Sequence, residues 1–293
     1  MSRPVLAIRD LTLGFKGWRG ETEVLHGISV TIDPGERVAL VGESGSGKSV
    51  TARIVLGLLQ SLRSARIGGT VEFDGRDLAG MSPAERRHLR GTRMSMIFQD
   101  PTSSLNPVYR IGTQFHEVLK RGVPDIGYEA AMARAGEILR EVSITEPQRV
   151  LGSYPFQLSG GMNQRVMIAM ALANEPDLLI ADEPGTALDV TVQAQTLDLM
   201  RRLVERHDTS VLFISHNLGV VREFADRVYV IYKGRIVEHG PTAALFDDPR
   251  HPYTRALMAA VPRLTGGGVP DIGEDTEVFS APMVDHGHGE QRP

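Results

Sequence analysis

The chain has 293 residues, of which 41% are hydrophobic and 23% are charged, and its formal net charge is −4. This composition is typical of a soluble globular protein, and the length suits one large domain or two modest ones. The negative net charge does not indicate a nucleic-acid-binding surface, and the absence of cysteine excludes disulfides and cysteine-ligated metals.

The N-terminal part of the chain is predicted to form an antiparallel β layer. Within residues 4–40, the segments VLAIRDLTLGF and VLHGISVTI alternate apolar and polar residues with a period of about two. The segment VEFDGRDL adds a strand that ends in a turn at Asp74 and Gly75. The chain begins without the apolar core of a signal peptide, and no window approaches about 18 apolar residues. We therefore expect neither a signal peptide nor a membrane-spanning helix.

Four short apolar runs are predicted to be strands buried on both faces of a parallel sheet. They are RVALV (37–41), MSMIF (94–98), LLIA (178–181) and VLFIS (211–215). Polar residues follow each run, in the order GESGSGKS, Gln99, Asp182 with Glu183, and His216. Because ligands bind at the carboxyl ends of strands in open α/β sheets, we expect these polar groups to lie at one sheet edge.

The remaining segments are predicted to be helical or loosely ordered. Residues 107–173 are mostly helix-forming, and YEAAMARAGEILREV (128–142) is the clearest helix among them. The tail from Gly266 is rich in glycine, proline and acidic residues, so we expect it to be loosely ordered.

The stretch GESGSGKS fits the phosphate-loop pattern, with a buried strand before it and a helix-forming segment after it. Its glycines let the loop curl so that backbone N–H groups face a β-phosphate, and Lys48 can reach the β- and γ-oxygens. The Ser49 hydroxyl can ligate Mg²⁺. The nucleotide contacts are predicted from Gly42, Glu43, Ser44, Gly45, Ser46, Gly47, Lys48, Ser49 and Val50. The alternative is a glycine-rich turn that binds no ligand.

Four further polar residues are predicted to carry the hydrolysis chemistry. Asp182 would hold Mg²⁺, and Glu183 would act as the general base for a water that attacks the γ-phosphate. Gln99 would sense the metal and the attacking water, and His216 would bond the γ-phosphate and orient the base. The alternatives are a solvated acidic pair at a strand end and a structural histidine.

A second glycine-containing stretch, QLSGGMNQRV (157–166), places a serine and two glycines before a helix-forming run. A helix start of this kind can bind an anion. Taken alone, the same stretch also fits an N-cap followed by a flexible turn.

Together these motifs resemble those of ATP-binding-cassette (ABC) ATPases. GESGSGKS, IFQDP, LSGGMNQRV, LLIADEP, ALDV and ISHN occur in the order and rough spacing of that family, over about residues 4–247. The resemblance implies an α/β fold with a RecA-like parallel-sheet core, an antiparallel β subdomain and an α-helical subdomain at about residues 100–173. It also implies ATP and Mg²⁺ as cofactors.

The family resemblance further implies that two cassettes bind head to tail. Ser159, Gly160 and Gly161 would then close over the nucleotide held by the partner's phosphate loop. Asp189 would lie at the dimer interface, and Phe15 or Trp18 would stack on adenine, with Phe15 nearer the usual position.

A narrower set of motifs looks like the ATPase subunits of dipeptide and oligopeptide importers, a group that includes nickel and opine systems. It adds IFQDPTSSLNP, ALDVTVQAQ and HPYTRALMAAVP (251–262). The resemblance implies an ABC domain at 1–247, a C-terminal extension with its tail at 248–293, and a heterodimer with a second ATPase. It also implies two transmembrane permease subunits, an extracytoplasmic substrate-binding protein and a peripheral location on the cytoplasmic face of the inner membrane. The cargo remains open among peptides, nickel, opines and other small solutes.

The sequence departs from the family pattern at Met162, where glutamine is common, at Gly185, where threonine is usual, and at Asn217, where aspartate is frequent. None of these departures removes a primary catalytic group. Without cysteine, the iron–sulfur cluster of some relatives has no ligands here. The alternative functions are an ABC ATPase that acts on nucleic acid or the ribosome and a small-molecule kinase or GTPase. The chain shows one cassette, no sustained heptads and no Asn-Lys-x-Asp guanine motif, so no nucleic-acid partner is expected.

Overall fold

The computed structural model describes residues 3–18, 20–100, 104–185, 190–260, 279 and 281–287. The chain divides into two compact units. The first combines Met1–Met81 with Leu212–Pro293, and the second is Ser82–Val211. Each unit contains β-strands, helices and a set of fully buried apolar side chains.

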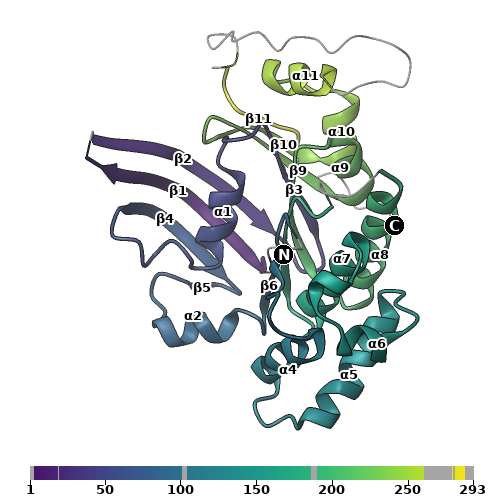
Figure 1. The fold of residues 1–293 in the computed structure, drawn as a ribbon. Coiled ribbons are helices and arrows are strands. Elements are labelled where there is room, and N and C mark those ends of the chain that lie inside the picture. Colours follow the sequence, from purple (N-terminus) through teal and green to yellow (C-terminus); the bar gives the residue numbers. More distant parts are fainter. Residues whose placement is uncertain are drawn as a thin grey trace. The chain divides into compact units, whose positions relative to one another are not determined.

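One layer of the first unit is a four-stranded antiparallel sheet in the order β2-β1-β4-β5 (Figure 1). Its strands are β1 (Leu6–Gly17), β2 (Gly20–Ile32), β4 (Ala65–Phe73) and β5 (Arg76–Asp77). The apolar side chains of the predicted alternating segments are buried, and those of Leu6, Ile8, Leu11 and Leu13 are fully so. The predicted turn is confirmed, because Asp74 and Gly75 join β4 to β5 with φ angles of 48° and 59°. The antiparallel layer is therefore as expected.

A second sheet of the first unit contains the parallel pair β3 (Arg37–Val41) and β9 (Arg227–Tyr232). Strand β9 continues antiparallel into β10 (Arg235–Pro241). The side chains of Val38 to Val41 have no exposed surface, as the uninterrupted apolar run predicts. The helices of this unit are α1 (Lys48–Val55), α9 (Leu218–Phe224), α10 (Thr242–Asp247) and α11 (Pro252–Ala259).

Part of the C-terminal tail is ordered, which differs from the expectation of loose order. Residues Val284–Asp285 form β11, which pairs in parallel with Glu238 and His239 of β10. The His286 ring lies against the Glu238 carboxylate at 2.7 Å, and both side chains are almost fully buried. A low-hydrophobicity composition does not reveal such a long-range polar contact, because it depends on a partner 48 residues away.

The second unit contains the parallel pair β6 (Met94–Ile97) and β7 (Leu178–Asp182). Its helical elements are α2 (Pro83–Leu89), α4 (Ile111–Gly122), α5 (Tyr128–Glu141), α6 (Pro147–Gly152), the 3₁₀ turn η1 (Pro155–Gln157), α7 (Gly160–Leu172) and α8 (Val190–Arg206). The predicted helical content of residues 107–173 is confirmed, and α5 matches its predicted range closely. Strand β8 (Ser210–Ser215) carries the chain from the second unit into the first.

Parallel strand pairs together with a separate antiparallel sheet confirm the predicted α/β class. The run at 94–98 is not buried on both faces as predicted, because Ser95 and Met96 are half-buried and Phe98, directly after β6, is 45% exposed. In the part of the chain that the structure describes, no helix has the length and apolar character needed to cross a bilayer.

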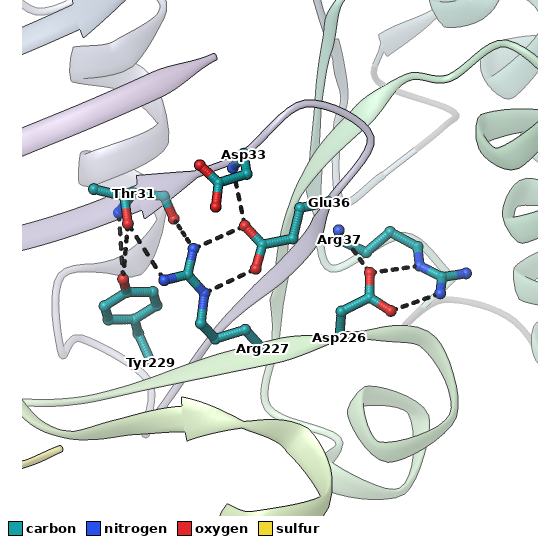
Figure 2. Close-up of polar contacts among 7 residues, drawn as sticks. All are labelled: Thr31, Asp33, Glu36, Arg37, Asp226, Arg227 and Tyr229. Carbon is teal, nitrogen blue, oxygen red and sulfur yellow. Dashed lines mark hydrogen bonds and ion pairs between the residues drawn. The ribbon is translucent and has the colours of Figure 1, made fainter. Parts of the chain in front are cut away.

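Paired charges occupy the amino ends of β3 and β9 (Figure 2). Arg37 donates to both carboxylate oxygens of Asp226, from Nε at 3.1 Å and from Nη2 at 2.7 Å. Arg227 donates to both oxygens of Glu36 in the same bidentate way, at 2.8 and 2.7 Å. Each pair joins the start of one strand to the start of its parallel neighbour.

The network at these amino ends also reaches the antiparallel sheet. Nη2 of Arg227 donates to the carbonyl of Thr31, near the end of β2, at 3.0 Å. The Tyr229 hydroxyl accepts from the Thr31 N–H at 3.3 Å (Figure 2). Since the side chains of Arg227 and Glu36 are only 6% and 18% exposed, this ion pair lies largely out of water.

The second unit has a comparable pair at the amino ends of its own parallel strands. Nε of Arg93, directly before β6, donates to Oδ2 of Asp177, directly before β7, at 2.6 Å. Both side chains are 45% exposed, so water competes with this contact far more than with the Arg227–Glu36 pair.

Candidate active site

The predicted phosphate loop follows the carboxyl end of β3. Gly42 leaves the strand so close to β9 that a Cβ atom there would lie 2.1 Å from the backbone oxygen of Ile231. Glu43, Ser44 and Gly45 form the exposed tip of the loop, whereas Ser46 and Gly47 are buried and Ser49 and Val50 lie half-buried in the first turn of α1. The loop therefore turns outward at residues 43–45 and returns into the unit at residue 46.

The Lys48 ammonium is folded back over this loop. Its Nζ donates to the carbonyl oxygens of Gly42 at 2.8 Å and Glu43 at 2.7 Å, and the residue is only 5% exposed. The positive charge is thus held beside the loop backbone, where a phosphate group would need it.

The start of α1 is suited to an anion. Its N-cap residue is Gly47, no side chain caps the helix, and its first turn contains no acidic residue. The buried Ser46 Oγ has no hydrogen-bond partner among the described residues. A helix start without a side-chain cap, a nearby ammonium and an unpartnered hydroxyl together form a site that fits a phosphate.

Sequence patterns did not reveal the two contacts that support the loop from behind. The Gly234 N–H, in the turn between β9 and β10, donates to the Ser46 carbonyl at 3.0 Å. The Glu43 N–H donates to the Tyr253 hydroxyl on α11 at 3.0 Å. Gly234 and Tyr253 each lie about 190 or more residues from the loop along the chain, so no local sequence pattern predicts these contacts.

In the second unit, two predicted catalytic side chains meet at the carboxyl ends of β6 and β7. Nε2 of Gln99 donates to Oε2 of Glu183 at 3.0 Å. Strands β6 and β7 pair in parallel up to Ile97 and Ala181, so both residues emerge at the same edge. With Nε2 engaged, Oε1 is the Gln99 atom that can accept from water or ligate a cation.

Asp182 ends β7 and is 8% exposed, and Glu183 follows it with a φ angle of 50°. A non-glycine residue in this left-handed region is strained, and such strain often occurs at functional positions. Gly185 has a φ angle of 107°, which explains why glycine suits a position where threonine is usual in the family.

His216 follows β8 and is exposed. The next residue, Asn217, is the N-cap of α9, and its Oδ1 accepts from the N–H groups of Gly219 at 3.1 Å and Val220 at 3.4 Å. The departure from aspartate at residue 217 therefore keeps the capping function.

Ser159 is the N-cap of α7, and its Oγ accepts from the Met162 N–H at 3.3 Å. Ser159 and Gly160 are exposed, and Gly161 is half-buried. The Ser159 hydroxyl oxygen thus caps the helix as an acceptor.

The two adenine candidates differ in exposure. Phe15 is half-buried within β1, between Thr22 of β2 and Ala65 of β4, whereas Trp18 is 88% exposed. Asp189 lies outside the described residues. The predicted residues also fall in both units, since Asp182, Glu183, Gln99 and the Ser159 loop belong to the second unit and the phosphate loop and His216 to the first.

Comparison with known families gives two matches. The ABC transporter family matches residues 25–186. The C-terminal region of oligopeptide and dipeptide transporters matches residues 237–277, which include α11 and most of β10.

Similar proteins carry peptide-transport names. The oligopeptide transport ATP-binding protein OppD of Bacillus subtilis is 48% identical over 268 residues, which cover 92% of this chain and 75% of that protein. The probable D,D-dipeptide transport ATP-binding protein DdpD of Escherichia coli is 46% identical over 270 residues, covering 92% and 81%.

Among solved structures, the chain is similar to the dimeric ATP-binding cassette MJ0796 in a post-hydrolysis state bound to ADP and Pi. The TM-score is 0.71 at 27% identity, over 81% of this chain and 98% of that one. This likeness agrees with the predicted ABC fold.

Proposed function

The chain belongs to the ABC transporter family, and from this we propose that it is the ATP-hydrolysing subunit of a membrane importer for dipeptides, oligopeptides or a related small solute. The observation that carries the proposal is the phosphate loop, in which a helix start without a side-chain cap lies beside the buried Lys48 ammonium. The peptide class is supported by the match of residues 237–277 to peptide transporters.

ATP binding is assigned to residues 42–50 of the first unit. Backbone N–H groups of the loop would receive the β-phosphate, and Lys48, held beside the loop by the Gly42 and Glu43 carbonyls, would reach the β- and γ-oxygens. Phe15 is the preferred adenine-stacking residue, with Trp18 as the alternative.

Hydrolysis is assigned to Glu183. Its carboxylate would take a proton from the attacking water, and the Gln99 amide holds it in place through the 3.0 Å hydrogen bond. His216 would bond the γ-phosphate. The oxygen donors of Ser49, Asp182 and Gln99 fit Mg²⁺, which prefers hydroxyl, carboxylate and amide oxygens. When bound, Mg²⁺ neutralises charge that develops on the phosphate oxygens.

Ser159, Gly160 and Gly161 are proposed to act on the partner's nucleotide. The exposed start of α7 can offer N–H donors to a γ-phosphate once two cassettes face each other. Asp189 is proposed to lie at that dimer interface. Two ATP molecules would then hold the dimer closed, and their hydrolysis would release it.

The proposed assembly contains a second, homologous ATPase and two transmembrane permease subunits, with an extracytoplasmic binding protein that delivers cargo. This chain would lie on the cytoplasmic face of the inner membrane, held there by the permeases. Its proposed domains are an ABC domain at 1–247, with the helical subdomain at about 100–173, and the extension at 248–293.

The test is to tag the chain at its native level, extract membranes in mild detergent and identify co-purifying proteins by mass spectrometry. The complex should contain two multi-spanning proteins and a second ATPase, and it should hydrolyse ATP faster when peptide-loaded binding protein is added. Recovery of ribosomal or DNA-repair proteins without a membrane subunit would refute the importer function.

A further inference from the structure

The phosphate loop of the first unit has a contact from the C-terminal extension that the family motifs do not include. The Tyr253 hydroxyl on α11 accepts from the Glu43 N–H at 3.0 Å, across 210 residues of sequence. The Tyr253 side chain has no exposed surface. Burial also raises the pKa of this hydroxyl, so it stays protonated at neutral pH.

This contact fixes one peptide group of the loop. The Glu43 N–H and the Gly42 carbonyl belong to the same planar peptide unit. Tyr253 binds its N–H, and Lys48 Nζ binds its carbonyl at 2.8 Å. Rotation of that peptide would therefore break both hydrogen bonds, including one of the two carbonyl contacts of the Lys48 ammonium.

The start of α11 is anchored so that the tyrosine cannot shift easily. The Glu238 carboxylate of β10 accepts from the backbone N–H groups of Arg250 at 2.8 Å and His251 at 3.1 Å, and from the His286 ring at 2.7 Å. Burial alone would raise the pKa of Glu238, but these hydrogen bonds hold it below its ordinary value. A buried, ionised carboxylate thus fixes the backbone directly before the helix.

The His251 ring completes this anchor. Its Nδ1 accepts from the Tyr253 N–H at 3.1 Å, so its proton lies on Nε2, which is 3.2 Å from the Ala281 carbonyl. The Tyr253 ring also packs against Tyr232 at a centroid distance of 4.3 Å and against Phe279 at 5.6 Å. Both the backbone and the ring of Tyr253 are therefore held.

We propose that Tyr253 is a positioning residue for nucleotide binding: α11 of the C-terminal extension holds the Gly42–Glu43 peptide in the orientation that presents Lys48 to the β- and γ-phosphates. The proposal rests on the proposed function, because it requires that this loop bind ATP. It gives the peptide-transporter C-terminal region a direct role at the nucleotide.

The test uses Tyr253→Phe in the full-length chain, with Mg-ATP affinity measured by isothermal titration. Loss of the hydroxyl removes one hydrogen bond and should raise the Kd for ATP roughly 2- to 10-fold, the range expected for one neutral hydrogen bond. Tyr232→Phe is the matched control, because this tyrosine belongs to the same ring cluster and its hydroxyl makes no hydrogen bond within the described ranges of the chain. The control should bind ATP as the wild type does.

Amide exchange provides a readout that a general loss of packing would not reproduce. By NMR, the Glu43 N–H of the wild type should exchange more slowly than that of Ser44 at the exposed tip, and Tyr253→Phe should abolish this difference while Tyr232→Phe keeps it. This comparison within the wild type stays informative even if the variant folds poorly.

The outcomes separate the inference from the proposed function. Unchanged ATP affinity in Tyr253→Phe, or equal losses in both tyrosine variants, overturns the positioning role while leaving the ATPase assignment intact. Failure of the wild-type chain to bind ATP overturns both. A selective loss of affinity together with faster Glu43 exchange supports the proposal.

Discussion

The amino end of β3 carries two bidentate arginine–carboxylate pairs shared with β9, whereas its carboxyl end leads into the phosphate loop and the start of α1, which has no side-chain cap. At the amino end, Arg37 and Arg227 are directed at Asp226 and Glu36 of the same unit (Figure 2). At the carboxyl end, Lys48 Nζ donates to the Gly42 and Glu43 carbonyls of the loop and so lies beside the helix start that fits a phosphate.

The second unit repeats this contrast. Arg93 and Asp177 pair before β6 and β7 begin, and Gln99 and Glu183 meet where the same strands end. The difference shows that the two ends of a parallel strand pair can have separate roles, one in stabilising the fold and the other in presenting polar groups. Charges at the amino ends satisfy each other and serve folding, while polar groups at the carboxyl ends are positioned but keep atoms for a ligand.

The largest effect is expected at the carboxyl ends, from Glu183→Gln. Glutamine keeps an oxygen that can accept from Gln99 Nε2 but cannot take a proton, so turnover should fall by about 10²–10⁴ while ATP binding persists. Phosphate release by the assembled complex is the measurement. Glu137→Gln, on the exposed side of α5, is the control and should keep full turnover. Near-normal turnover of Glu183→Gln would remove this residue from the role of base.

Ser159→Arg tests the proposed role of the start of α7 at a partner's nucleotide. Because the residue is exposed at the start of α7, the isolated chain should bind ATP normally and lose only about 1 kcal/mol of stability with the cap. Turnover at the partner's site should fall about 10²-fold or more, as when a donor to a developing charge is removed. Loss of ATP binding by the isolated chain would contradict the head-to-tail assignment.

Arg227→Met tests the amino end. It leaves the largely buried Glu36 carboxylate without its partner, which should lower the free energy of unfolding by about 3–5 kcal/mol. Chemical denaturation measures this loss. The double variant Glu36→Gln/Arg227→Met should recover part of the stability, and ATP affinity of the folded protein should stay the same. A loss of ATP affinity without loss of stability would contradict the claim that the amino-end pairs stabilise the fold and do not take part in nucleotide binding.

The smallest effect is expected from Arg93→Met at the amino end of the second unit. Because Arg93 and Asp177 are each 45% exposed, the unfolding free energy should change by less than about 1 kcal/mol. Urea denaturation under the conditions used for Arg227→Met gives a direct comparison. A loss as large as that of Arg227→Met would mean that burial does not govern the strength of these pairs.

Much of this arrangement could be predicted from local sequence. The apolar runs that begin at residues 37, 94 and 178 form strands of parallel pairs. The run at residues 37–41 is buried on both faces, as its uninterrupted apolar sequence predicts. The glycine-rich loop was recognised by its spacing, and the polar residues after each run by their place at a strand end. Gln99 and Glu183 are 84 residues apart, yet the place of each after a parallel strand predicted that both lie at one sheet edge, where they form a hydrogen bond.

The contacts that local sequence could not predict are those between distant residues without a shared pattern. Tyr253 lies in the HPYT segment, which was identified through its resemblance to peptide importers. No residue adjacent to it in sequence indicates a contact with Glu43. The buried Glu238–His286 contact orders a tail segment whose composition favours disorder. In each case the decisive partner is chosen by tertiary packing.

Gly42 has a consequence for how such sequences diverge. The carbonyl of Ile231 lies where any side chain at residue 42 would begin, so the fold itself requires glycine there whether or not a nucleotide ever binds. A duplicated copy released from selection for catalysis would be free to lose Glu183 but would still conserve Gly42. In inactive descendants of this chain, Gly42 would therefore still identify the family, whereas the presence or loss of Glu183 would distinguish active from inactive copies.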